Sequence, residues 1–277
     1  MTQLDFTKMH GLGNDFIVIE HDGRTPLPTT EDWRRLADRH TGIGFDQALV
    51  LQPPRDAATC VYYRIFNSDG GEVQQCGNGA RCIAAYLQRR GRVPAGELHM
   101  DSAGGRVIAR IADHGNVAVD MGLPNFEPSA LPFEAAAKAP SYQLELAGDT
   151  VEIGAVSLGN PHAVLQVASV AAAPVASLGP AIQQHARFPQ RVNVGFMEIA
   201  ARDHIRLRVF ERGAGETLAC GTGACAAVAI ARQRQLVDTD VQVDLPGGRL
   251  EVSWPSPTDH IWLKGPTAVS FTGTVAL

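Results

Sequence analysis

The chain has 277 residues, of which 45% are apolar, and its formal net charge is −5. This length suits two domains with sizeable cores, and the charge excludes the basic surface that nucleic-acid binding requires. No apolar run is long enough to span a bilayer, and the polar first residues do not resemble a signal peptide.

An internal repeat organises the chain. Residues 64–80 align without gaps with residues 208–224, and Arg, Phe, Gly-Glu, Cys-Gly and Gly-Ala recur at matching places. A second pair of segments, 12–18 and 158–164, matches at nearly the same offset. Two matches in the same order predict two homologous halves.

In the first half, alternating apolar residues predict short strands at 16–20 and 62–66. A glycine-rich turn, Cys76 and a buried helix over 78–90 follow, and Gly91 is expected to end that helix. Further strands are expected at 97–100, 106–111 and 117–121.

The second half repeats this plan. Residues 123–140 are rich in proline and alanine, and we interpret them as a linker. Cys220 precedes a helix expected over 222–235, whose residues 224–231 are apolar on every face and therefore predict complete burial. Later strands are expected at 241–244, 249–254 and 261–264, and the tail, 266–277, has the pattern of a last strand that could pair with either domain.

Strands wrapped around a buried helix indicate an α+β fold with two pseudo-symmetric domains and mostly antiparallel sheets. We expect the first domain over residues 1–122, completed by the tail 266–277. The second domain is expected over residues 123–265.

Two cysteines, Cys76 and Cys220, stand at the N-terminal ends of the two buried helices. The free amides and the dipole at that position lower a thiol pKa and favour the thiolate. The Gly-x-Gly after each cysteine leaves bare N–H groups that can hold a carboxylate. Two such sites facing each other across a cleft would place one thiol on each side of an α-carbon, as two-base racemisation requires.

Racemisation of an amino acid without an electron-sink cofactor depends on N–H dipoles that stabilise the enolate-like charge. The three lysines lack the context of a pyridoxal phosphate site, so no cofactor is expected. The alternative is that the two cysteines are structural, because free cysteine is often buried. Cysteine at both equivalent positions, between neighbours that differ, favours catalysis. The remaining cysteines lack a glycine-rich context and are expected to be structural: Cys60, Cys82 and Cys225.

The cysteines and histidines also indicate the cellular compartment and the kind of ligand. An odd number of cysteines without a Cys-x-x-Cys pair argues against a disulfide framework, so we expect a soluble cytoplasmic protein. No cysteine and histidine cluster has the spacing of metal ligands. We therefore expect a small-molecule substrate, with no metal, nucleic acid or membrane as partner.

Six segments together resemble the diaminopimelate epimerase family along nearly the whole chain. They are residues 9–16, 66–70, 75–82, 159–162, 192–195 and 211–223. The resemblance implies two barrel-like domains that convert LL-diaminopimelate to the meso form, in lysine and peptidoglycan synthesis, without metal or pyridoxal phosphate. The Cys-Gly-x-Gly segments alone also fit proline racemases and hydroxyproline epimerases.

The resemblance implies roles for individual residues. Cys76 and Cys220 would be the acid/base pair. The reacting carboxylate would be held by Gly77, Asn78, Gly221 and Thr222, and the rest of the substrate by Asn14, Gln47, Asn67, Asn160, Asn193, Glu211 and Arg212. His162 either tunes a cysteine pKa or is a core histidine, and Glu211 is a second candidate for that tuning. The family is also expected to form homodimers, with an aromatic residue near Phe271 at the interface.

The distal end of diaminopimelate carries its own carboxylate and ammonium. Arg212 can bind the carboxylate bidentately, and Glu211 can accept from the ammonium. The alternative is a surface ion pair between these two residues on a turn. A proline racemase would instead need a pocket for a ring. A dithiol redox protein would need a Cys-x-x-Cys pair, and a dinucleotide-binding module would need a third glycine in its motif.

Overall fold

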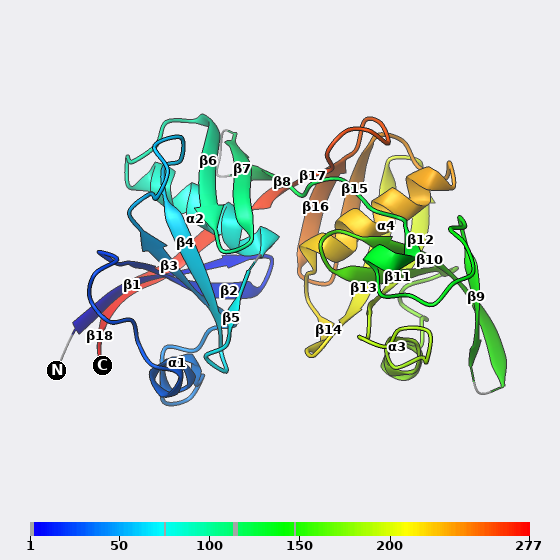
Figure 1. Ribbon diagram of the computed structural model, residues 1–277, viewed down its shortest axis with the longest axis horizontal. Coiled ribbons are helices and arrows are strands. Elements are labelled where there is room, and N and C mark those ends of the chain that lie inside the picture. The colour runs from blue at the N-terminus through cyan, green and yellow to red at the C-terminus, as the bar shows by residue number, and fades with distance from the viewer. Residues whose placement is uncertain (1–2, 75, 113–115, 147) are drawn as a thin grey trace. The chain divides into compact units, whose positions relative to one another are not determined.

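The computed structural model describes residues 3–74, 76–112, 116–146 and 148–277. The chain forms two compact units, one of Met1–Asp120 with Gly265–Leu277 and one of Met121–Lys264. Each unit consists of strands around one long helix, with a shorter helix at its margin (Figure 1). Within the described ranges, no helix has the length and apolar character needed to cross a membrane.

The first unit surrounds helix α2 with strands that come from both ends of the chain. Its elements are β1 (Gln3–Gly11), β2 (Asn14–Glu20), α1 (Thr30–Ala37), β3 (Gln47–Gln52), β4 (Tyr62–Asn67), β5 (Glu72–Val73), α2 (Gly77–Arg89), β6 (Gly96–Ser102), β7 (Gly105–Ile111), β8 (Asn116–Asp120) and β18 (Ala268–Ala276). Helix α2 packs against β1, β2, β7 and β8.

The second unit surrounds helix α4 in the same way. Its elements are η2 (Pro128–Ala130), β9 (Tyr142–Leu146), β10 (Asp149–Ser157), β11 (Pro161–Gln166), α3 (Val175–Gln183), β12 (Asn193–Ala201), β13 (His204–Glu211), β14 (Gly215–Thr217), α4 (Gly221–Gln233), β15 (Asp240–Leu245), β16 (Gly248–Ser253) and β17 (Trp262–Pro266). Helix α4 packs against β10, β11, β12, β13 and β16.

The two units share one pattern of strand pairing. In the first, β1–β2 is antiparallel, β2–β3 parallel, β3–β4 antiparallel and β4–β6 parallel. In the second, β10–β11, β11–β12, β12–β13 and β13–β15 follow the same order of directions. A parallel pair needs a crossover, and helices supply it at both places in each unit. The predicted α+β fold with two mostly antiparallel halves is therefore confirmed.

The register of the parallel pair β2–β3 matches that of β11–β12 residue by residue at the offset of the sequence repeat. Phe16 is paired with Gln47 in the first unit, and His162 is paired with Asn193 in the second. Both members of the second pair lie 146 positions after those of the first. The repeat found in the sequence is thus a repeat of backbone structure.

The central helices begin and end within two residues of their predicted limits. In α4, the side chains from Ala224 to Ala231 have no exposed surface, as its all-round apolar pattern predicts. Close packing continues into the sheet, because a Cβ added at Gly154 of β10 would lie 2.5 Å from Ile230 Cγ2. Bulk at position 154 would therefore separate β10 from α4.

Two shorter helices, α1 and α3, were not expected from the sequence. Helix α1 carries a capping box, in which Thr29 accepts from the Asp32 amide and Asp32 accepts from the Thr29 amide. It buries Trp33 and Leu36 against the sheet. The capping box was a usable signal, whereas α3 contains Pro180 and lacks a side-chain cap.

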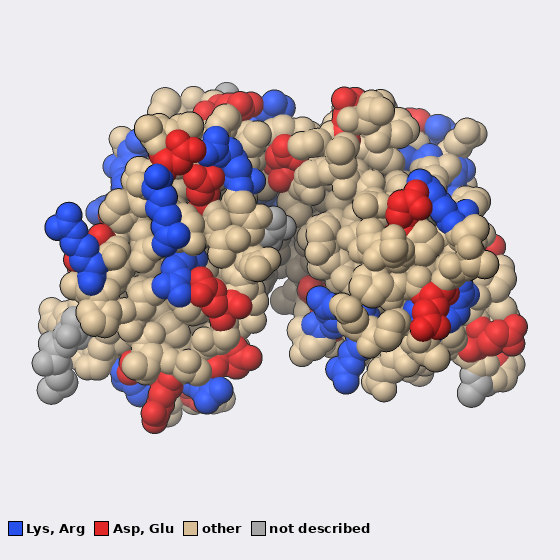
Figure 2. Space-filling model, in the orientation of Figure 1, with Lys and Arg blue, Asp and Glu red and all other residues tan. Residues whose placement is uncertain are grey.

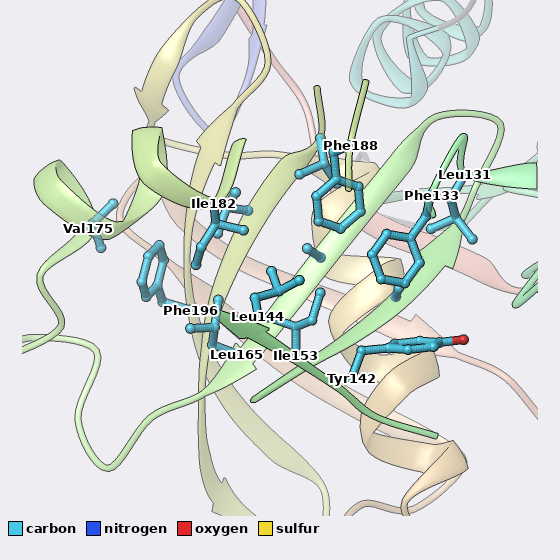
Figure 3. Close-up of a cluster of buried hydrophobic side chains, with 14 residues drawn as sticks. Leu131, Phe133, Tyr142, Leu144, Ile153, Leu165, Val175, Ile182, Phe188 and Phe196 are labelled. Carbon is cyan, nitrogen blue, oxygen red and sulfur yellow. The ribbon is translucent and has the colours of Figure 1, made fainter. Parts of the chain in front are cut away.

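The interpretation of residues 123–140 as a linker is wrong. Leu131 and Phe133 are only 1% and 5% exposed and belong to a core cluster of the second unit. The Phe133 ring stacks on Phe188 at 4.5 Å and meets Tyr142 edge-on (Figure 3). The apolar anchors decide the structure here, although proline and alanine dominate the composition.

The tail forms β18, which pairs antiparallel with β1 from Gln3 to His10. The C-terminal strand therefore belongs to the first unit. On the face shown in Figure 2, acidic and basic side chains are interspersed over each unit, without a large area of one sign.

Candidate functional site

Each candidate cysteine is the N-cap residue of a central helix. The Cys76 sulfur accepts a hydrogen bond from the Gly79 amide at 3.3 Å, at the start of α2. The Cys220 sulfur lies 3.6 Å from Thr222 Oγ1, at the start of α4. Amides in the first turn of a helix have no partner within that helix. The two thiols therefore lie beside groups of N–H donors in equivalent positions.

The second glycine of each Cys-Gly-x-Gly motif allows this arrangement. A Cβ added at Gly79 would lie 3.0 Å from Leu49 Cδ2 and 3.5 Å from the sulfur of its cysteine. At Gly223 it would lie 3.0 Å from Val209 Cγ2 and 3.2 Å from the Cys220 sulfur. A side chain at either position would push the helix start away from its strand or displace the thiol.

In the first unit, a chain of hydrogen bonds runs from α2 toward β3. Arg81 Nη2 donates to Asn78 Oδ1 at 2.9 Å, and Asn78 Nδ2 donates to Asn14 Oδ1 at 3.1 Å. Asn14 Nδ2 then donates to Asp46 Oδ2 at 2.9 Å. The chain joins two predicted substrate-binding residues, Asn14 and Asn78, to a buried arginine and a carboxylate that were not predicted.

Asp15, beside Asn14, anchors the same region. Lys8 Nζ lies 2.5 Å from its carboxylate, and Arg39 donates to both oxygens at 2.7 and 2.9 Å. Burial alone would raise the pKa of Asp15, but the hydrogen bonds from Arg39 and Lys8 outweigh it and lower the pKa to about 2. Asp15 is thus ionised at neutral pH and accepts from the Asp46 amide at 3.0 Å, which joins the ends of β2 and β3.

The second unit has an equivalent chain built from different residues. Asn160 Nδ2 donates to Thr222 Oγ1 at 3.3 Å, and His162 Nε2 lies 3.0 Å from Asn160 Oδ1. Asn160 and Thr222 occupy the repeat positions of Asn14 and Asn78. Because Thr222 also contacts the Cys220 sulfur, this chain ends on the thiol.

A second pair of predicted residues lies on neighbouring strands of each unit. Gln47 Nε2 donates to Asn67 Oδ1 at 2.9 Å in the first unit. In the second, Asn193 Nδ2 donates to the Pro161 carbonyl at 3.1 Å, and its Oδ1 accepts from the Arg212 amide at 2.8 Å. Asn193 therefore fixes the backbone of the turn that carries Arg212.

No ion pair between Glu211 and Arg212 is present among the described residues, so the surface-pair alternative is wrong. Glu211 accepts from the Thr217 hydroxyl at 2.5 Å. The Arg212 guanidinium is exposed and donates to the Gln190 carbonyl at 3.2 Å. Arg212 thus presents a cation that no carboxylate of the described chain neutralises.

The expectation of a lowered pKa is wrong for Cys220. Burial and the nearby Glu211 carboxylate raise its pKa well above the usual value, and the Thr222 hydroxyl and Gly223 amide only partly offset them. The side chain is almost completely buried, which the dipole argument ignored. Cys220 is therefore a neutral thiol at neutral pH, a form suited to donating a proton.

His162 is also buried, with 1% of its surface exposed. Burial, with a smaller contribution from the Arg212 charge, lowers the pKa of His162 to about 3. The imidazole is thus neutral at physiological pH and carries one N–H. Its hydrogen bond to Asn160 joins it to the chain that ends on the Cys220 thiol.

We predict a pH-dependent stability from His162. Below the unfolded value of 6.5, only the unfolded state takes up a proton, so stability present above that pH is lost as pH falls toward the folded value of about 3. Between about pH 7.5 and 5.5, wild type should lose about 1.4 kcal/mol more unfolding free energy than His162→Gln. Urea unfolding of both proteins at the two pH values measures this, and equal losses would contradict a neutral buried imidazole.

The structure groups the predicted residues by unit. The first unit brings together Asn14, Gln47, Asn67, Cys76, Gly77 and Asn78, and the second Asn160, His162, Asn193, Glu211, Arg212, Cys220, Gly221 and Thr222. Sequence reasoning missed Asp46, Arg81 and Thr217. Arg81 had a signal, because a charged residue interrupts the apolar helix two positions after the Cys-Gly-Asn-Gly motif.

The other cysteines lie outside these groups. Cys82 and Cys225 are buried inside α2 and α4, and burial raises the pKa of Cys82 to about 12. All five cysteines are free thiols. Among the described residues, no group of three His, Cys, Asp or Glu side chains could hold a metal ion.

Known proteins resemble this chain in sequence and in fold. A curated diaminopimelate epimerase from Alkalilimnicola ehrlichii is 52% identical over 274 residues, which cover 98% of both chains. The fold is similar to a Bacillus anthracis phenazine biosynthesis protein of the PhzF family, with TM-score 0.74, 17% identity and 100% of both chains covered. It is also similar to a probable proline racemase from Agrobacterium radiobacter, with TM-score 0.72, 18% identity and coverage of 99% and 93%. A diaminopimelate epimerase family model matches residues 6–127 and 154–269, and the chain belongs to that family.

Proposed function

We propose that this chain epimerises LL-2,6-diaminopimelate to meso-diaminopimelate, for lysine and peptidoglycan synthesis, by two-base proton transfer through Cys76 and Cys220. The observation that carries the proposal is the pair of thiols at the N-caps of equivalent helices, in units with the same strand pairing. Family membership and the 52% identical relative support the substrate. The reaction is an isomerisation, so it needs no net oxidant or reductant.

The proton balance follows from the two sulfurs. A thiolate on one face of the α-carbon takes the α-proton and becomes a thiol, while the thiol on the other face gives its proton and becomes a thiolate. The neutral state of Cys220 suits the acid in one direction. In the reverse direction, donors at Thr222 and Gly223 stabilise the Cys220 thiolate.

The carboxylate on the reacting carbon would accept from the free amides at the helix starts, beginning with Gly77 and Gly221, and from the side chains of Asn78 and Thr222. These preformed N–H and O–H dipoles stabilise the enolate-like charge as the proton leaves. The remaining predicted residues would bind the rest of the substrate: Asn14, Gln47, Asn67, Asn160, Asn193, Glu211 and Arg212.

The lysines support a reaction without pyridoxal phosphate. The chain contains three, and each forms an ion pair: Lys8 with Asp15, Lys138 with Glu127 and Lys264 with Glu251. A Schiff-base lysine must be free to leave its partner and react with a carbonyl. Lys8 is buried and also donates to the Gly44 carbonyl, whereas the other two lie at the surface.

Exchange of the α-hydrogen tests this function. In D2O, the enzyme should introduce deuterium at Cα of LL-diaminopimelate, with meso product, and should leave L-proline unlabelled. Mass spectrometry of both amino acids, incubated side by side, measures the exchange. Labelling of proline alone would instead favour a proline racemase, the alternative suggested by the shared fold.

We propose further that the protein is a cytoplasmic homodimer. Five free thiols are consistent with a reducing compartment. Phe271 on β18 is 50% exposed and packs edge-on against Phe6, which leaves part of an apolar surface uncovered along the tail. A sedimentation experiment that finds only monomer at micromolar concentration would contradict the dimer.

A further inference from the structure

We propose that Arg81 is a positioning residue, which fixes the side-chain amides of Asn78 and Asn14 so that each presents an N–H group to the substrate. This inference rests on the proposed function and adds a role for a residue that does not itself contact the substrate. It is carried by the hydrogen-bond chain of the first unit, from Arg81 through the two asparagines to Asp46.

The two ends of the chain determine its direction. An arginine side chain can only donate hydrogen bonds, and a carboxylate can only accept them. Asn78 must therefore turn its oxygen toward Arg81 and its nitrogen toward Asn14. Asn14 must turn its nitrogen toward Asp46, which leaves its oxygen for Asn78. Neither amide can rotate by half a turn without placing donor against donor or acceptor against acceptor.

The fixed direction has a consequence for binding. An amide nitrogen carries two hydrogens, and the chain uses one at each asparagine. The second N–H of Asn14 and of Asn78 remains as a donor for a carboxylate. A rotated amide would offer a carbonyl oxygen instead, which repels a carboxylate. The chain thus selects the orientation that matches an anionic substrate.

Asp46 is itself fixed in an orientation in which its carboxylate accepts hydrogen bonds. Its Oδ2 also accepts from the Asp15 amide at 3.1 Å, and its Oδ1 accepts from Arg39 at 2.9 Å. Arg39 bridges Asp46 to Asp15 by ion pairs of 2.9 and 2.7 Å. The acceptor end of the chain is therefore held by the Asp15 amide on β2 and by the Arg39 guanidinium.

Arg81 lies where a charge is costly. Its side chain has no exposed surface, and a Cβ added at Gly11 of β1 would lie 3.1 Å from its Nη2. A buried guanidinium must be hydrogen-bonded to be tolerated. The repeat position in the second unit holds Cys225, and there the group facing the asparagine oxygen is His162. Each unit thus has its own buried nitrogen group beside an asparagine, and that of the first unit is Arg81.

Substitution of Arg81 by glutamine tests the direction of the chain. Glutamine offers either an oxygen or a nitrogen, so Asn78 is no longer forced into one orientation. We expect Arg81→Gln to lower kcat/KM for LL-diaminopimelate at least about tenfold, the size expected for losing a hydrogen bond to a charged group. Arg81→Lys, which still only donates, should recover a substantial part of that loss.

The opposite end provides a second test that spares the buried position. The Asp46 side chain is 44% exposed, so Asp46→Asn should leave the core intact even where Arg81→Gln impairs folding. It should lower kcat/KM about three- to tenfold, because an amide can donate toward Asn14. In the double variant, which carries both Arg81→Gln and Asp46→Asn, the two losses in kcat/KM should not multiply. Breaking either end of the chain already allows the asparagine amides to rotate.

Tyr86→Phe is the matched control. It removes a hydrogen bond from the same helix, between the Tyr86 hydroxyl and Glu20, and leaves the chain untouched. We expect a lower Tm with unchanged kcat/KM. The positioning role is overturned if Arg81→Gln keeps wild-type kcat/KM, if lysine recovers nothing, or if the losses of the two ends multiply. If wild type itself does not exchange the α-hydrogen of diaminopimelate, the proposed function fails instead.

Discussion

Replacing Cys76 or Cys220 by alanine should lower the rate of epimerisation by at least about 10³-fold, because positioned acid and base groups each contribute that order. The reaction needs a base on one face of the α-carbon and an acid on the other, so neither thiol can replace its equivalent. Because Cys220 is buried like Cys82 and Cys225, a thermal unfolding curve of each alanine variant separates a loss of stability from a loss of chemistry. Racemisation assays in both directions measure the loss.

Serine variants separate the two faces. A serine at position 76 or 220 keeps a polar N-cap, so α2 or α4 should remain intact. Such a variant can retain slow α-hydrogen exchange from the side of the surviving cysteine, without inversion. Cys60→Ala is the control, because Cys60 lies outside both cysteine motifs. Full epimerase activity in either alanine variant would exclude the two-thiol mechanism.

The sequence repeat predicted the most about this structure, because it constrains long-range pairing. A repeat of side chains at a nearly constant offset requires a repeat of backbone positions. The equivalent pairs Phe16–Gln47 and His162–Asn193 show this directly. Helices α2 and α4 were also predictable, because a run of apolar residues after each Cys-Gly-x-Gly motif is typical of a buried helix.

Other features depend on tertiary contacts that a single sequence does not display. Composition made residues 123–140 look like a linker, but two apolar side chains, Leu131 and Phe133, fix them in a core. A helix start alone implied a lower thiol pKa, but burial and Glu211 reverse its direction at Cys220. The hydrogen-bond chain through Arg81 required the positions of α2, β2 and β3 together.

The two halves share the cysteines and the groups around them, but they differ where the rest of the substrate would bind. Asn67 of the first unit corresponds to Glu211 of the second, and Ser68 corresponds to Arg212. The reacting carbon of the substrate carries a distal arm on one side only. Two halves that bind different parts of such a substrate must differ. On the proposed function, the charged side chains of Glu211 and Arg212 would bind the distal ammonium and carboxylate of diaminopimelate.

Arg212→Lys should therefore lower kcat/KM for diaminopimelate about ten- to a hundredfold, since a charged, bidentate hydrogen-bonded pair is replaced by a point charge. The fold should be unaffected, because the guanidinium is exposed and bonds only to the Gln190 carbonyl among the described residues. Steady-state kinetics with LL-diaminopimelate and a thermal unfolding curve check the two expectations.

Arg206→Lys is the matched control for this change. Arg206 lies on β13 in the same unit, is about half exposed and pairs with Glu198, so the same substitution should leave kcat/KM unchanged. Glu211→Gln is a poorer test of binding, because removing that carboxylate also lowers the pKa of Cys220. Among the described residues of the second unit, no hydrogen bond joins Arg212 to Cys220, so a loss at Arg212→Lys that appears in KM more than in kcat would assign it to the distal carboxylate. Wild-type kinetics at Arg212→Lys would mean that this end of the substrate is bound elsewhere.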